Sequence, residues 1–163
     1  MQIRTARLTD AEAIRGIYNR AILTVATFDL KPRSLEEQQQ WLALRSGAHL
    51  VLVADNGGTL AGFASLSPYR DRPAYRTTVE NSVYVDESFQ GKGVGKLLMS
   101  ELVDDARDHG FHSVIARIVS SNAASIALHR AVGFEIVGVE KEVGRKLGRW
   151  LDVVVMQRML SVR

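Results

Sequence analysis

Apolar and polar residues follow one another along the chain in segments whose period changes several times, as in mixed α/β proteins. Runs rich in β-branched and aromatic residues predict strands, and apolar residues spaced three and four apart predict helices. The predicted strands span residues 2–6, 50–54, 60–66, 78–85, 113–119, 134–143 and 150–159. The predicted helices begin near residues 9, 34, 94 and 122. We therefore expect one α/β domain of the α+β kind over residues 1–163.

Capping and turn residues support these boundaries. Thr9 with Glu12, and Ser34 with Glu37, have the spacing of capping boxes at helix starts. Residues 56–58, Asn-Gly-Gly, lie between two apolar runs and predict a tight β-hairpin.

A glycine-spaced segment connects the strand over 78–85 to the longest helix. In order, its residues are Gln90, Gly91, Lys92, Gly93, Val94, Gly95 and Lys96. Because glycine lacks a Cβ, the backbone of such a loop can approach a phosphate closely. The helix that follows offers unpaired amides and a partial positive charge to an anion, and the two lysines add formal charge. The segment predicts a site for a phosphate-bearing cofactor, although glycines at such a connection also occur as plain turn residues.

Spacing excludes a P-loop and disfavours a dinucleotide-binding loop. A P-loop has a glycine five residues before its Gly-Lys pair and Ser or Thr after it, but this chain has Gln90 and Leu97 there. The dinucleotide fingerprint needs a third glycine where Lys96 stands, and it follows the first strand instead of a central one. A different kind of phosphate loop is therefore expected.

The composition narrows the available chemistry. The chain has no cysteine, which excludes disulfides, thiolate metal ligands and an acyl-cysteine intermediate. His49, His109 and His112 lack metal-ligand spacing, so no metal site is expected. The net charge of +3 is spread over 21 basic and 18 acidic residues without a basic cluster, so no nucleic-acid partner is expected. No apolar run has membrane-spanning length and no signal segment is evident, so we expect a cytoplasmic protein without a membrane partner.

One carboxylate interrupts the apolar strand over 78–85. Strand alternation places Glu80 on the face opposite Val79, Asn81 and Val83. Partial burial raises the pKa of a carboxyl, and such a group is suited to take the proton of an amine. The plain alternative is a solvated strand glutamate, because charged residues are usually exposed.

The glycine segment resembles a known cofactor loop. Gln-x-x-Gly-x-Gly between a strand and a helix is similar to the acetyl-CoA pyrophosphate loop of the GCN5-related N-acetyltransferases, or GNAT enzymes. Residues 122–134 resemble the family's second cofactor segment. Residues 17–19, 78–85 and 144–152 resemble its phosphinothricin and methionine sulfoximine acetyltransferase branch. The resemblance covers nearly the whole chain and implies the GNAT acyl-CoA N-acyltransferase fold, a mixed, mostly antiparallel sheet flanked by helices.

The resemblance also implies roles around the cofactor. In this fold the strand before the loop splays from its neighbour, and its free backbone groups pair with the pantetheine arm. The positions that would contact acetyl-CoA are Val83, Tyr84, Val85, Gln90, Gly91, Lys92, Gly93, Val94, Gly95, Lys96, Asn122 and Ser125. Glu80 matches the catalytic glutamate of the branch. His129 stands where many GNAT enzymes have a proton-donating tyrosine, although a histidine on an amphipathic helix also has a structural explanation.

The loop over residues 68–76, called here the acceptor loop, indicates the amine substrate. It contains three arginines, whose guanidinium forks suit a carboxylate or phosphinate, although a solvated basic loop would have the same composition. With the branch as a guide, the substrate positions are Arg70, Asp71, Arg72, Glu80, Asn81 and Ser82. Phe28 and Tyr75 are expected either as apolar walls of the substrate site or as core residues. Close relatives often carry proline and an aromatic residue where this chain has Asp71 and Arg72.

The predicted activity is acetyl-CoA-dependent acetylation of the α-amine of a small amino acid or analogue by direct transfer. Phosphinothricin, methionine sulfoximine and methionine sulfone are the substrates that the branch implies. The alternatives are another amine, such as a protein N-terminus or a polyamine, and a non-catalytic acyl-CoA-binding sensor. We also expect a homodimer, with residues 153–156 in its interface or in the core. Trp150 is expected to be packed, with a place at the border of the active site, beside Arg149, as the alternative.

Overall fold

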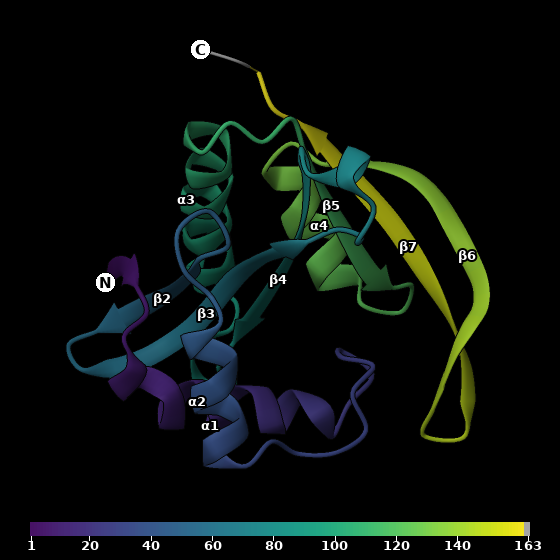
Figure 1. Cartoon of the computed structure of the whole chain (residues 1–163). Coiled ribbons are helices and arrows are strands. Elements are labelled where there is room, and N and C mark those ends of the chain that lie inside the picture. Colours follow the sequence, from purple (N-terminus) through teal and green to yellow (C-terminus); the bar gives the residue numbers. More distant parts are fainter. Residues whose placement is uncertain (162–163) are drawn as a thin grey trace.

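In the computed structural model, residues 1–161 form a seven-stranded sheet with helices on both faces (Figure 1). The strands are β1 (Gln2–Thr5), β2 (Val51–Asn56), β3 (Thr59–Pro68), β4 (Thr78–Val85), β5 (Ser113–Val119), β6 (Glu135–Lys146) and β7 (Arg149–Met159). The helices are α1 (Ala11–Ile22), α2 (Leu35–Ala43), α3 (Val94–Asp108) and α4 (Ala123–Ala131). Short 3-10 turns are η1 (Leu8–Asp10), η2 (Pro73–Tyr75) and η3 (Glu87–Phe89). The mixed α/β architecture is the predicted one.

The strand order creates an opening in the middle of the sheet. The order is β1-β2-β3-β4-β5-β7-β6, and within the described residues β4 and β5 form the one parallel pair. These two strands pair through residues 78–80 and 113–115 and then separate. The second half of β4 therefore has no ladder partner on β5, and its backbone groups on that side face the opening.

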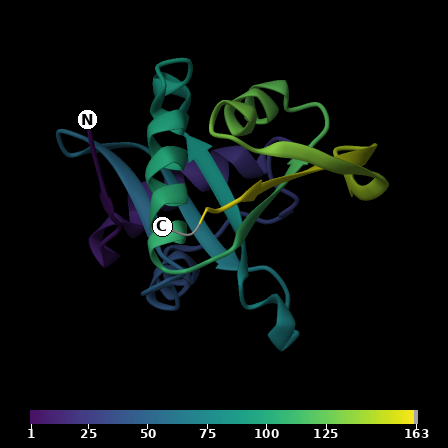
Figure 2. The ribbon, with the colours of Figure 1, turned by 90° about the horizontal axis from the view of Figure 1, so that it is seen from above.

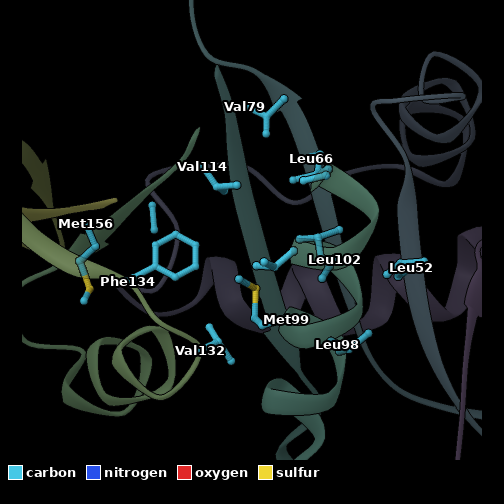
Figure 3. Close-up of a cluster of buried hydrophobic side chains, with 14 of the residues drawn as sticks. Leu52, Leu66, Val79, Leu98, Met99, Leu102, Val114, Val132, Phe134 and Met156 are labelled. Atoms are coloured by element: carbon cyan, nitrogen blue, oxygen red, sulfur yellow. The ribbon is translucent and has the colours of Figure 1, made fainter. Parts of the chain in front are cut away.

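Two apolar clusters hold the helices on opposite faces of the sheet (Figure 2). Side chains of β2 alternate between them, because Leu52 and Ala54 belong to one cluster and Val51 and Val53 to the other. Helices α3 and α4 cover the first face, and α1 and α2 cover the second. Figure 3 shows the cluster under α3, with these buried residues labelled: Leu52, Leu66, Val79, Leu98, Met99, Leu102, Val114, Val132, Phe134 and Met156. Each such side chain stabilises the fold by about 1.5–3 kcal/mol.

Several local signals are confirmed. Strands β4 and β5 span the predicted residues. At the start of α2, the Ser34 hydroxyl accepts a hydrogen bond from the Glu37 amide at 3.1 Å, and the Glu37 carboxylate accepts one from the Ser34 amide at 3.0 Å. In the β2–β3 hairpin, Gly57 and Gly58 have φ values of 67° and 97°, which glycine adopts without strain.

The capping box predicted at Thr9 is wrong. Helix α1 begins at Ala11, after the turn η1. The carboxylate of Asp10 accepts a hydrogen bond from the Arg7 amide at 2.7 Å and lies 2.8 Å from Arg4 Nη1. Asp10 is thus the residue at the start of α1, while its carboxylate closes the preceding turn η1 and caps no amide of the helix.

The C-terminal hairpin differs from the expectation at its end. Trp150 is 61% exposed, with the Arg145 guanidinium 4.7 Å from its ring centroid, so the prediction that it packs inside is wrong. Val153, Val154 and Met156 are buried in the core of the chain. Of the two alternatives for residues 153–156, the core is therefore the observed one.

Candidate active site

The separation of β4 and β5 opens a cavity of about 550 Å³. The second half of β4, the glycine loop (residues 90–96), β5 and α4 surround it. The residues predicted to contact the cofactor that line this cavity are Val83, Tyr84, Val85, Gln90, Gly91, Gly93, Val94, Gly95, Lys96, Asn122 and Ser125. The ammonium of Lys92 instead lies 5.6 Å from the centroid of the Phe89 ring. Segments far apart in the sequence thus share one cavity.

The three glycines of the loop meet two different requirements. Gly91 and Gly93 have φ values of +72° and +82°, which residues with a side chain rarely adopt. Gly93 is also the N-cap of α3, and no side chain caps that helix start, so its first amides are available to an anion. A Cβ at Gly95 would lie 2.9 Å from Leu128 Cδ2, so this glycine allows α3 to approach α4 closely.

Hydrogen bonds to the backbone fix two polar residues of the cavity wall. Asn122 Oδ1 accepts from the Ser125 amide at 3.1 Å and so caps α4. Gln90 Nε2 donates to the carbonyl oxygen of Val85 at 3.3 Å, which links the glycine loop to the end of β4. Both side chains are therefore held in place by the fold.

Glu80 lies where the two strands separate. It projects from the face of β4 opposite the buried Val79 and Asn81, and its side chain is 32% exposed. Burial raises the pKa of the Glu80 carboxyl, and the charges of Arg117 and Arg70 partly oppose that rise. Arg117 Nε lies 3.9 Å from Glu80 Oε1. The geometry provides a half-buried carboxylate beside the cavity.

His129 lies on the other face of β4 and is 2% exposed. Its Nδ1 is 2.7 Å from the carbonyl oxygen of Ser125, which only accepts hydrogen bonds, so Nδ1 carries a proton. Its Nε2 is 3.0 Å from Asn81 Nδ2, which donates to it. Burial lowers the pKa of His129. The two partners therefore fix the tautomer of the ring, and burial favours its neutral form.

The predicted substrate residues Asn81 and Ser82 project from opposite faces of β4. Asn81 follows Glu80 in sequence but projects from the opposite face, toward His129 and toward the Met99 sulfur at 3.4 Å. Its Oδ1 is buried and has no hydrogen-bond partner among residues 1–161. Ser82 lies two residues after Glu80, so it shares the face of Glu80 and lines the cavity. The structure thus places Ser82, and not Asn81, on the side of Glu80.

The acceptor loop brings an arginine and two tyrosines together near Glu80. The rings of Tyr69 and Tyr75 are in edge contact, with centroids 5.4 Å apart. The Arg70 guanidinium lies 4.9 Å from the Tyr69 centroid, and its charge lowers the pKa of Glu80. Asp71 and Arg72 are exposed and outside this cluster.

Phe28 belongs to the loop between α1 and α2, which docks on β6. A Cβ at Gly144 would lie 2.6 Å from the Phe28 ring, so only glycine permits this contact. The buried Lys146 donates from Nζ to the carbonyl oxygen of Thr27 at 2.7 Å. Tyr18 hydrogen-bonds the Thr27 hydroxyl at 3.1 Å. These contacts hold Phe28, which is 44% exposed, at the edge of β6.

One family model matches a part of the chain that contains both cofactor segments. Residues 14–134 match the model described as "Acetyltransferase (GNAT) family". The chain belongs to the GNAT family. The match includes β4, the glycine loop and α4, so the family resemblance inferred from these segments is confirmed.

Relatives of this GNAT protein are similar to it in sequence over nearly the whole chain. It is 42% identical to the L-amino acid N-acyltransferase MnaT of Escherichia coli (strain K12), with 100% of this chain and 96% of that protein covered. It is also 42% identical to an L-methionine sulfoximine/L-methionine sulfone acetyltransferase of Pseudomonas aeruginosa, with 98% and 94% covered.

Solved GNAT structures have the same fold. A phosphinothricin acetyltransferase from Sinorhizobium meliloti, in complex with AcCoA, has a TM-score of 0.94 and 42% identity, covering 98% of this chain and 88% of that one. A ribosomal-protein-alanine N-acetyltransferase from Brucella melitensis has a TM-score of 0.95 and 43% identity, covering 98% and 100%. The predicted GNAT fold is confirmed.

Two residues of this GNAT site were not predicted from the sequence. Arg117 interrupts the apolar strand β5 as Glu80 interrupts β4, so the same signal of a lone charge would have found it. Lys146 has no comparable local signal, because its burial depends on the distant α1–α2 loop. Within residues 1–161 no helix is long and apolar enough to cross a membrane, and no cluster of three or more metal-ligating side chains occurs.

Proposed function

We propose that this protein transfers the acetyl group of acetyl-CoA directly to the α-amine of a small amino acid or analogue. The observation that carries the proposal is the half-buried Glu80, which lies next to Arg117, a residue lining the cavity that the glycine loop walls. Phosphinothricin, methionine sulfoximine and methionine sulfone are the favoured acceptors, because proteins named for these substrates are relatives at 38–42% identity.

The cavity residues fit acetyl-CoA. The pyrophosphate would lie against the positive-φ backbone of Gly91 and Gly93 and the uncapped start of α3, near Lys96. The pantetheine arm would pair with the free backbone groups of Val83 and Val85, where β4 has left β5. When bound, acetyl-CoA supplies an activated thioester carbonyl that an amine can attack.

Glu80 is proposed as the general base. An α-ammonium group arrives protonated at neutral pH and must lose a proton before its nitrogen becomes a nucleophile. Burial raises the pKa of Glu80, which brings its proton affinity closer to that of the amine. The chain has no cysteine for an acyl-enzyme, which supports direct transfer.

His129 is proposed as a second proton carrier. It lines the cavity, and its Nε2 is the unprotonated ring nitrogen. In this tautomer Nε2 would have to release Asn81, accept the second proton that the amine loses as the amide forms, and pass that proton to the leaving thiolate. The hydrogen bond from Nδ1 to the Ser125 carbonyl supports a fixed ring orientation.

Arginine and aromatic side chains are proposed to bind the amino acid. Arg70 would contact its carboxylate or phosphinate, and Tyr75 and Phe28 would flank its side chain. Arg72 and Asp71 are exposed on the same loop and would reach a bound ligand only from its outer side. Asn81 would act through His129, since it projects from the face opposite Glu80.

We also propose a cytoplasmic homodimer that associates through β6. This strand ends the sheet order, and it exposes Ile136, Val137, Val139 and Val143 by 42–56%. An edge strand with exposed apolar side chains is suited to pair with a second copy. Sedimentation equilibrium of the wild type and of Val139→Lys would test this, with a monomeric variant expected.

The activity test measures free coenzyme A released from acetyl-CoA. The acceptors are methionine sulfoximine, phosphinothricin, methionine sulfone, a polyamine and a peptide with N-terminal alanine. We expect saturable turnover with the amino-acid analogues and a loss of about 100-fold or more in Glu80→Gln, the usual contribution of a general base. Glu135→Gln removes an exposed glutamate of β6 and serves as the matched control.

Other outcomes would redirect the proposal. Turnover with the alanine peptide alone would assign a protein N-terminus as the acceptor. Turnover with the polyamine alone would assign a polyamine. Tight acetyl-CoA binding in isothermal titration, without thioester cleavage for any amine, would support a cofactor sensor.

A further inference from the structure

Three charged residues from three strands form a row on one face of the sheet. Glu80 lies on β4, Arg117 on β5 and Glu140 on β6, and β7 runs between the last two strands (Figure 1). Arg117 Nη2 donates a hydrogen bond to Glu140 Oε1. Its Nε is 3.9 Å from Glu80 Oε1, beyond hydrogen-bond distance. The guanidinium is therefore shared unequally between the two carboxylates.

Strand register explains how the row arises. Glu80 is paired with Ile115 across the parallel β4–β5 ladder, and Arg117 lies two residues farther along β5 on the same face. Arg117 is paired with Val155 on β7, so its long side chain crosses β7 to reach β6. The side chains of Glu80, Arg117 and Glu140 are 32%, 34% and 38% exposed, so solvent screens them only in part.

We infer that Arg117 is a positioning residue for Glu80, and that Glu140 controls it by keeping the guanidinium hydrogen-bonded to β6. The inference rests on the proposed role of Glu80 as the base. A base that is fully paired with an arginine stays ionised at low pH but binds a proton weakly. Glu140 prevents that pairing, while Arg117 stays near enough to orient the carboxylate.

The other groups around Glu80 leave Arg117 as its main partner. The register partners of Glu80, Ser67 on β3 and Ile115 on β5, carry no charge. Arg70 in the acceptor loop lowers the pKa of Glu80 less than Arg117 does, and Glu80 in turn raises the pKa of Tyr84 on β4. No other titratable group contributes to the pKa of Glu80 among the described residues.

Removing Arg117 and removing Glu140 should therefore move the pKa of Glu80 in opposite directions. Arg117→Gln removes the nearby cation, so the pKa of Glu80 should rise. Glu140→Gln releases the guanidinium, which can then hydrogen-bond Glu80, so the pKa of Glu80 should fall. For partly exposed pairs we expect each shift to be about half a pH unit, equivalent to about 0.7 kcal/mol.

The test is a carbon-13 NMR titration of the Glu80 carboxyl in the full-length protein without substrate. Glu80→Gln identifies the resonance by its loss. Arg117→Lys, which keeps the cation, should retain most of the wild-type midpoint. Glu135→Gln removes the same charge from the same strand and should leave the midpoint unchanged. Opposite shifts in Arg117→Gln and Glu140→Gln support the inference, and unchanged or parallel shifts overturn it.

An activity measurement separates this inference from the proposed function. The acidic limb of the pH profile of kcat/KM should move with the NMR midpoints, upward in Arg117→Gln and downward in Glu140→Gln. Opposite NMR shifts in a protein that releases no coenzyme A with any amine would support the electrostatic row and reject the enzyme. Turnover that depends on Glu80, with a profile that neither variant moves, would retain the enzyme and reject the role of Arg117.

Discussion

Asn81 Nδ2 lies 3.0 Å from His129 Nε2, although the two residues are 48 positions apart in sequence. Both are buried, and the Ser125 carbonyl fixes the proton of His129 on Nδ1. The contact connects β4 to α4 beneath the cavity. A proton added to the His129 imidazole would therefore disturb the contact between β4 and α4 on the cofactor-binding face.

The burial of His129 should make folding stability depend on pH. An unfolded histidine has a pKa near 6.5, and burial lowers the pKa of His129 in the folded protein. Below about pH 6.5, His129 binds a proton more readily in the unfolded state than in the folded state, so the free energy of unfolding decreases as pH falls. We expect the free energy of unfolding in urea to decrease by up to about 1.4 kcal/mol per pH unit more in wild type than in His129→Phe.

Glu80 also contributes to the pH dependence of folding stability. Its folded pKa is raised from the ordinary value of 4.5, so Glu80 stabilises the fold below that value and loses this contribution as pH rises through its folded pKa. Wild type and His129→Phe both contain Glu80, so its contribution is common to the two proteins and cancels when their pH slopes are compared between pH 7.5 and 5.5. Equal pH slopes in wild type and His129→Phe would show that His129 does not carry the effect.

Asn81→Leu should destabilise the protein. Leucine has the same number of side-chain heavy atoms and the same branching as asparagine but cannot donate to His129 Nε2, which would remain buried without a partner. The expected loss is about 1–3 kcal/mol in the free energy of urea unfolding. Asn56→Ala, at the exposed end of β2, is the control and should change stability little. A loss as small as that of Asn56→Ala would mean that the Asn81–His129 contact contributes little.

Gly144→Ala should displace the α1–α2 loop. The new Cβ would lie 2.6 Å from the Phe28 ring, so the ring or the strand must move, at a cost of about 1–3 kcal/mol. Steady-state kinetics should show a higher KM for the amine with an unchanged Kd for acetyl-CoA. Gly138→Ala lies on the same strand in open space and is the matched control. Identical kinetics for the two variants would contradict a role for Phe28 at the acceptor site.

Gly93→Ala should weaken acetyl-CoA binding through the backbone alone. A Cβ at this position meets no atom within 4 Å, but φ is +82°, which costs an L-residue about 1–2 kcal/mol. If the backbone relaxes, the amides at the start of α3 turn away from the pyrophosphate. Isothermal titration should show a higher Kd than in Gly138→Ala, and an equal Kd would reject anion binding by this turn.

The sequence predicts features that depend on neighbouring residues. The β-branched run of β4 and the apolar run of β5 are predicted over their observed ranges, because each is bounded by polar or turn residues. The Ser34 capping box and the Gly57–Gly58 turn are likewise local arrangements. Alternation along one strand also places Glu80 opposite Asn81.

The sequence by itself therefore determined the strands and helices, the glycine loop and the face of Glu80, because hydrogen bonding and alternation within a few residues fix them. The tertiary structure decided the partners: Asn81 with His129, Arg117 with Glu140, and Lys146 with the Thr27 carbonyl. It also left Trp150 exposed and placed Asp10, instead of Thr9, directly before α1. Such contacts depend on strand order, register and the docking of distant loops, which many weak contacts across the whole chain set together.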